Sequence, residues 1–91
     1  MCCVVGWISL AGVPACANKR LLRDILRLQW NFTGYVVSDD DALEFIIIQH
    51  HYVNDSVSAA AAVVKAGVNL ELTDIPVNVF GSIPEVCTTY L

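Results

Sequence analysis

The feature that most limits how this chain can fold is its alternation of short, uniformly apolar runs with helical segments. Apolar runs of strand length cover residues 4–8, 35–38 and 68–72. Between them, apolar residues recur at helical spacing over 21–29 and 57–66. Strands that are apolar on both faces and alternate with helices are typical of a parallel sheet covered on both sides. The predicted order is β-α-β-α-α-β, with a short helix or strand after the second strand, and the fold class is α/β.

Local signals mark the ends of the predicted helices. Asn18 is a suitable N-cap for the first long helix, and Asn54 or Asp55 for the alanine-rich second. Gly67 lies where a glycine commonly ends a helix. No comparable signal organises the tail, 77–90, which we expect to be irregular or weakly helical.

The length and apolar composition indicate that this sheet is part of a larger fold. The chain has 91 residues, of which 56% are hydrophobic and 15% are charged, so it is too apolar to be intrinsically disordered. A chain of this length buries one modest core, and its helices would cover a three-stranded parallel sheet poorly. We therefore expect part of a larger α/β fold, with Trp7 and Trp30 in the core.

The charged residues argue against nucleic acid as a partner. The net charge is −4. Four of the five basic residues fall within 19–27, where Arg20, Arg23 and Arg27 form the outward face of one predicted helix. A solvated helix face in an acidic chain is not the basic footprint that nucleic-acid binding needs.

The cysteines and the N-terminal segment carry little functional information. The cysteines are Cys2, Cys3, Cys16 and Cys87. Their spacings match no common zinc pattern, so they are expected to be buried apolar residues, and no disulfide, metal or cofactor is assigned. Residues 1–18 are uncharged but interrupted by glycine and proline, which makes them too short and broken for a membrane span. They also lack the basic start of a signal peptide, and a buried strand followed by a loop is expected there.

An acidic cluster, Asp39, Asp40 and Asp41, directly follows the second predicted strand. Functional groups of parallel α/β folds gather at the C-terminal ends of strands. A carboxylate there can act as a nucleophile, bind a metal or activate water, but such residues also commonly cap a following helix. A small magnesium or phospho-receiver site would need a lysine at a later strand end, whereas Lys65 falls in a predicted helix.

Polar residues also interrupt the third predicted strand. Asn69 and Glu71 share one face of it. A buried glutamate needs a partner, and either a structural hydrogen-bonded pair or a functional group satisfies this pattern. His50 and His51 are adjacent, so their side chains diverge and a shared metal is not expected.

Three segments together resemble glycoside hydrolase family 3, the β-glucosidase and β-xylosidase family. They are residues 12–18 (GVPACAN), 30–39 (WNFTGYVVSD) and 66–72 (AGVNLEL). The resemblance is strongest over 4–72, and residues 1–91 are assigned to the N-terminal catalytic domain. It implies a TIM-like barrel, of which this chain supplies about the last three strands, parallel to one another, with their helices.

The resemblance implies that Asp39 is the nucleophile of a retaining β-glycosidase. Retention requires a second carboxyl group about 5 Å away as acid/base, and the family usually takes it from a second domain. Asp40, Asp41 and Ala42 after the nucleophile resemble the β-xylosidase branch, whose pattern is Ser-Asp-x-Asp-Ala. The implied substrate is therefore a β-linked xyloside or xylo-oligosaccharide. No cofactor is implied, and an extracellular location is expected from the family.

The departures from the family pattern concern sugar contacts. Trp7 stands where the family has a tyrosine near the nucleophile, so it is the candidate substrate-binding residue, whereas Ile8 and Ala11 replace polar residues. A TIM barrel needs about 250 residues, and the earlier sugar-binding residues, the rest of the barrel and the second domain lie outside these 91. We therefore expect a fragment that is inactive alone; the alternative is an orphan fragment without catalysis.

Overall fold

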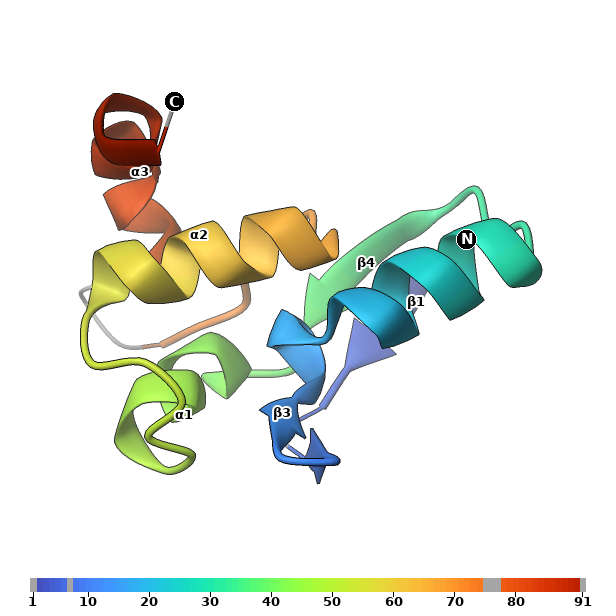
Figure 1. Cartoon of the computed structure of the whole chain (residues 1–91), viewed down its shortest axis with the longest axis horizontal. Helices are drawn as coiled ribbons and strands as arrows, with labels where there is room; N and C mark the ends of the chain where they lie inside the picture. The colour runs from blue at the N-terminus through green and yellow to red at the C-terminus, as the bar shows by residue number, and fades with distance from the viewer. Residues whose placement is uncertain (1, 7, 75–77, 91) are drawn as a thin grey trace.

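The computed structural model describes residues 2–6, 8–74 and 78–90, and Figure 1 shows the chain. Its elements follow the predicted alternation, with two short strands and a helical tail in addition. In chain order they are β1 (Cys2–Val5), β2 (Ser9–Leu10), β3 (Val13–Pro14), η1 (Ala15–Ala17), η2 (Arg20–Gln29), β4 (Tyr35–Ser38), α1 (Ala42–Ile48), α2 (Ser56–Ala66), η3 (Val79–Ser82) and α3 (Ile83–Tyr90).

The strand β4 is the centre of the sheet. On one side it pairs in parallel with β1, in a register that runs from Cys2 opposite Tyr35 to Val5 opposite Ser38. On its other side one parallel bridge joins Val37 to Leu70. The predicted third strand is therefore much shorter than its apolar pattern suggested. On either side of this bridge, a side-chain oxygen accepts the backbone N–H in place of a carbonyl: that of Asn69 bonds the Val36 N–H, and that of Ser38 bonds the Leu72 N–H.

A tight hairpin precedes the first helices, where the sequence predicted a loop. Strands β2 and β3 pair in antiparallel fashion. The two residues between them, Ala11 and Gly12, have φ angles of 52° and 81°, as the twist of a two-residue hairpin requires. Glycine adopts this conformation without penalty, whereas Ala11 carries a Cβ that disfavours it.

The helix η2 confirms the predicted helix and its cap. The side-chain oxygen of Asn18 accepts a hydrogen bond from the Leu21 N–H at 3.0 Å. The helix is wound with the wider π spacing and ends where the Trp30 N–H bonds the Ile25 carbonyl at 2.9 Å. Two expectations here were wrong. Trp30 is 70% exposed because it follows the last turn of η2, and Arg27 is half-buried and bonded rather than solvated.

The helix α2 is capped as predicted, with Asp55 as the N-cap. Its carboxylate accepts hydrogen bonds from the Ser58 N–H at 2.8 Å and the Ser58 hydroxyl at 3.0 Å, and these bonds lower the pKa of Asp55. Gly67 ends the helix with φ of 110°. The tail, expected to be irregular or weakly helical, forms η3 and α3, and Asn78 caps η3 by accepting a bond from the Gly81 N–H at 2.6 Å.

The core is centred on α2, which packs against α1, α3, η1 and η3, and Val36 of β4 also belongs to it (Figure 1). Its largest fully buried apolar side chains are Leu43, Ile46, Val36, Val63 and Val79. Small residues on α2 let the neighbouring elements approach closely. Several large apolar side chains remain on the surface, among them Ile8, Leu28 and Trp30. None of the helices in the described residues combines the length and apolar character that a membrane crossing requires.

The hairpin turn yields a stability prediction. Replacing Ala11 by glycine removes the Cβ that a positive φ disfavours, at a smaller cost in unfolded-chain entropy. We expect Ala11→Gly to raise the free energy of unfolding by roughly 0.5–1 kcal/mol in urea denaturation. The matched control is Ala62→Gly within α2, which should lower it by about 1 kcal/mol. Destabilisation of equal size by both changes would contradict the turn geometry.

Candidate active site

Asp39 follows the last residue of β4 and is exposed. Its carboxylate oxygen Oδ1 accepts a hydrogen bond from the Asp40 N–H at 2.9 Å. Its backbone carbonyl accepts one from the Ala42 N–H at 3.0 Å, at the start of α1. The chain thus turns immediately after the strand and leaves the Asp39 carboxylate at the sheet edge, facing water.

Backbone on both sides of Asp39 is anchored to the segment 70–73. Before it, Ser38 is fully buried, its N–H bonds the Leu70 carbonyl at 2.9 Å, and its hydroxyl accepts from the Leu72 N–H at 3.0 Å. After it, the Asp41 N–H bonds the Leu72 carbonyl at 3.0 Å. The Asp41 carboxylate also accepts a hydrogen bond from the Thr73 hydroxyl at 2.7 Å. These four bonds hold Asp41 in the left-handed region, with φ of 57°.

Three further carboxylates crowd this edge. One oxygen each of Asp40, Asp41 and Asp74 lies within 4.8 Å of the other two. Partial desolvation, followed by the negative charges of Asp41, Asp74 and Asp39, raises the pKa of Asp40. Asp41 is half-buried and Asp40 and Asp74 are exposed. Oxygen ligands of this kind suit a hard divalent cation, but exposed acidic groups commonly cluster without one.

Cys16 of η1 lies close enough to Asp39 to feel its charge. The side chain is 1% exposed, and burial together with the Asp39 carboxylate raises the thiol pKa to about 12. A thiol with so high a pKa stays protonated and is a poor nucleophile. Cys16 therefore acts as a small, neutral side chain beside the candidate nucleophile, as its predicted role as a buried apolar residue implied.

The two polar residues of the third predicted strand both have structural partners. Glu71 accepts hydrogen bonds from the Val79 N–H at 2.8 Å and the Phe80 N–H at 2.7 Å, at the start of η3. The Asn69 side-chain oxygen accepts from the Val36 N–H at 2.9 Å and from the Arg27 guanidinium at 2.8 Å. Of the two interpretations that the sequence left open, the structural one holds for both residues.

Arg27 connects the end of η2 to the start of β4. Its guanidinium donates hydrogen bonds to the carbonyls of Phe32 and Gly34 and to Asn69. It also lies over the Phe32 ring, 5.4 Å from the ring centre, where a cation is attracted by the aromatic face. The sequence pattern missed this role because the partners are set by tertiary structure.

The remaining candidates do not join Asp39. Trp7 lies outside the described residues. His50 accepts or donates a hydrogen bond with the Ser9 hydroxyl at 3.0 Å, and His51 is exposed. Cys87, whose thiol is free, is exposed on α3 rather than buried as predicted, and it is not among the core residues.

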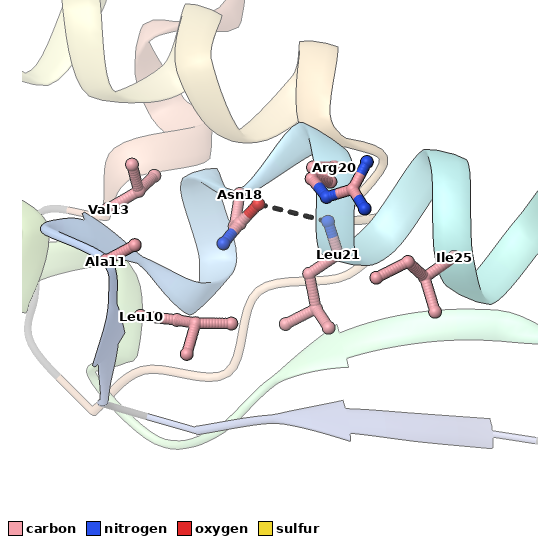
Figure 2. Close-up of a pocket in the computed structure, with 7 residues that line it drawn as sticks. All are labelled: Leu10, Ala11, Val13, Asn18, Arg20, Leu21 and Ile25. Atoms are coloured by element: carbon pink, nitrogen blue, oxygen red, sulfur yellow. Dashed lines mark hydrogen bonds between the residues drawn. The ribbon is translucent and has the colours of Figure 1, made fainter.

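A separate, mostly apolar cavity of about 290 Å³ lies between the hairpin and η2. Figure 2 shows Leu10, Leu21 and Ile25 around it, with Asn18 and Arg20 at its polar side. None of the acidic residues at the end of β4 lines this cavity. It is therefore not the place where Asp39 would meet a substrate.

Two similar proteins of known sequence are named as xylosidases. The chain is 42% identical to beta-D-xylosidase 1 of Arabidopsis thaliana over 60 residues. This match covers 66% of this chain and 8% of that protein. It is 46% identical over 66 residues to the exo-1,4-beta-xylosidase bxlB of Emericella nidulans, covering 69% of this chain and 9% of the relative. The chain therefore spans about a tenth of the length of these relatives.

Solved structures agree with this relationship. A beta-glucosidase involved in saponin metabolism from intestinal bacteria superposes with a TM-score of 0.86 and 38% identity, covering 99% of this chain and 12% of that chain. A family 3 exo-beta-xylosidase in complex with a xylobiose aziridine probe superposes with a TM-score of 0.70 and 32% identity. The match covers 75% of this chain and 9% of that chain. The fold is thus of the TIM-barrel-like α/β class. Residues 1–89 match the model of the glycosyl hydrolase family 3 N terminal domain, and the chain belongs to that family.

Proposed function

We propose that residues 1–91 form part of the N-terminal barrel domain of a retaining β-glycosidase and contribute its nucleophile, Asp39. The observation that carries this proposal is the exposed carboxylate of Asp39 at the end of a parallel strand, with anchored backbone on both sides. Membership of family 3 supports it. The strands β1 and β4 and the bridge at Leu70 would be about the last three strands of the barrel.

In the proposed reaction an oxygen of Asp39 forms a bond to the anomeric carbon of the sugar. The bond from that carbon to the leaving-group oxygen breaks, and an acid from another part of the enzyme protonates that oxygen. Water then attacks the glycosyl-enzyme, gives a proton to the same acid/base, and releases Asp39 and the sugar. The Asp40 N–H bonded to Oδ1 orients the Asp39 carboxyl for the attack.

The acid/base is expected to come from a second domain, together with the missing sugar contacts. The described glutamates do not suit the role: Glu71 is bound to two backbone N–H groups, Glu44 is buried, and Glu85 lies on α3. A single carboxylate cannot run both steps of the reaction. Catalysis therefore requires further chain beyond the segment described.

A β-linked xyloside or xylo-oligosaccharide is the substrate class that we favour. The residues after Asp39 fit the xylosidase branch, and the relatives of known sequence carry xylosidase names. A β-glucoside is the second candidate, because similar solved structures are named as β-glucosidases. The resemblance to family 3 also suggests an extracellular location for the whole enzyme.

Two other functions rank lower. A non-catalytic fragment is consistent with a chain that spans about a tenth of its relatives. A magnesium or phospho-receiver site is consistent with the closeness of Asp40, Asp41 and Asp74. It would need a lysine at a strand end, however, and Lys65 lies exposed on α2.

Residues 1–91 alone should not hydrolyse a glycoside. We expect no measurable release of nitrophenol from aryl β-xylosides or β-glucosides by the purified 91-residue chain, because it offers no acid/base to Asp39. A catalytically dead Asp39→Asn chain serves as the blank. Turnover that this substitution abolishes would show that the chain is sufficient and would refute the proposed division of the active site.

The role of Asp39 is tested by grafting. The matching segment of the Emericella nidulans xylosidase is replaced by the corresponding residues of this chain, and hydrolysis of an aryl β-xyloside is measured. We expect Asp39→Asn to lower kcat by on the order of 10⁴-fold. The adjacent Asp40→Asn is the matched control and should keep most of the activity, since that carboxylate lies in the neighbouring acidic cluster.

A second readout separates chemistry from folding. In an Asp39→Gly graft, added azide can replace the missing nucleophile and should restore turnover, with a glycosyl azide of inverted configuration as product. Equal activity losses in the Asp39 and Asp40 variants, without azide rescue in a graft that melts like its parent, would sink the assignment of Asp39.

A further inference from the structure

Glu44 is a buried acid for which the proposed reaction has no use. It lies in the first turn of α1 and is only 6% exposed. Neither oxygen of its carboxyl accepts a hydrogen bond from any residue that the structure describes. A carboxylate buried without donors is costly, whereas a protonated carboxyl needs only an acceptor for its own hydrogen.

Glu71 supplies such an acceptor. Its carboxyl lies beside that of Glu44, and its two oxygens already accept hydrogen bonds from the N–H groups of Val79 and Phe80. Two backbone donors favour the charged form of a carboxyl group. Glu71 is therefore the hydrogen-bond acceptor of the pair, and Glu44 is the member that carries the proton.

We propose that Glu44 and Glu71 share one proton, carried by Glu44 and directed at Glu71, and that this pair is a pH-sensitive latch between α1 and the segment 70–73, which carries Glu71. Burial, and then the neighbouring Glu71 carboxyl, raise the pKa of Glu44 to about 7. The shift has the direction that a proton shared between two carboxyl groups requires.

The other groups around Glu44 do not remove this coupling. Helix α1 packs on α2 and η1. The face that α2 turns to the core is made of alanines and valines, and its Lys65 is exposed. On η1, Cys16 is neutral because its pKa is raised to about 12. The backbone of Glu44 and the Thr73 hydroxyl both lower the pKa of Glu44, but burial and Glu71 outweigh them and the pKa stays raised. The Thr73 hydroxyl is also donated to Asp41.

The latch is closed at low pH and opens as the pH rises. Because the folded pKa of Glu44 lies above its ordinary value of 4.5, folding favours the protonated form. Its stabilising contribution is complete below about pH 4.5 and is lost as the pH passes through about 7. Above that pH two adjacent carboxylates repel each other, and the contact that weakens is the one between α1 and the residues that carry Glu71.

The test is the thermal midpoint of the 91-residue chain between pH 5 and pH 9. We expect the wild-type midpoint to fall by roughly 5 °C or more between pH 6 and pH 8.5. Glu44→Gln keeps the shape and a donor but cannot ionise, so its midpoint should stay nearly level over that range. Glu85→Gln, on the exposed first turn of α3, is the matched control and should fall like the wild type.

Each outcome decides the proposal. A fall that persists unchanged in Glu44→Gln belongs to groups other than Glu44 and overturns the latch. Should Glu44→Gln not fold, the side-chain carboxyl carbons of the three glutamates are titrated by ¹³C NMR in the wild type. One glutamate with a midpoint near 7 supports the pair, and three ordinary midpoints overturn it. No glycoside enters either measurement, so this result is independent of the proposed function.

Discussion

The pairing of β4 with the segment 68–72 is the interaction on which the acidic strand end depends. Only Val37 and Leu70 form a backbone bridge, and side chains extend it in both directions. The side-chain oxygen of Asn69 accepts a hydrogen bond from the Val36 N–H, and the Ser38 hydroxyl accepts one from the Leu72 N–H. Since Asn69 also binds Arg27, the same pairing fixes the end of η2. The register of this short contact therefore sets the position of Asp39 relative to everything around it.

Local signals predicted most of the secondary structure. The strand over 35–38, the cap at Asn18 and the α2 helix between Asp55 and Gly67 are all encoded within a few neighbouring residues, and the structure confirms them. The shortness of the third strand was not predicted, and of the two alternatives left open for the tail, irregular or weakly helical, the structure shows the helical one. Both depend on particular side-chain hydrogen bonds, such as those of Glu71 to the N–H groups at the start of η3, and a periodic pattern does not reveal such partners.

The same limit applies to the candidate site. The position of Asp39 after an apolar strand could be predicted, because strand ends in parallel sheets follow from the order of elements. The bond between Asp41 and Thr73 and the closeness of Cys16 could not, because they join residues that are tens of positions apart. For Arg27 the sequence prediction was wrong. Its spacing placed it on a solvated helix face, whereas its guanidinium bonds Asn69 and lies over the Phe32 ring.

The acids near the end of β4 differ in how their charge is accommodated, and this difference gives the edge its chemistry. Asp41 accepts a hydrogen bond from the Thr73 hydroxyl and Glu71 accepts two from the N–H groups at the start of η3, so both act as structural anchors. Desolvation, followed by the neighbouring acids, raises the pKa values of Asp40 and Glu44. Asp39 alone combines an anchored backbone with a carboxylate exposed to water and oriented by a neighbouring N–H. A nucleophile must be held in place yet remain open to its substrate, and among these acids only Asp39 meets both conditions.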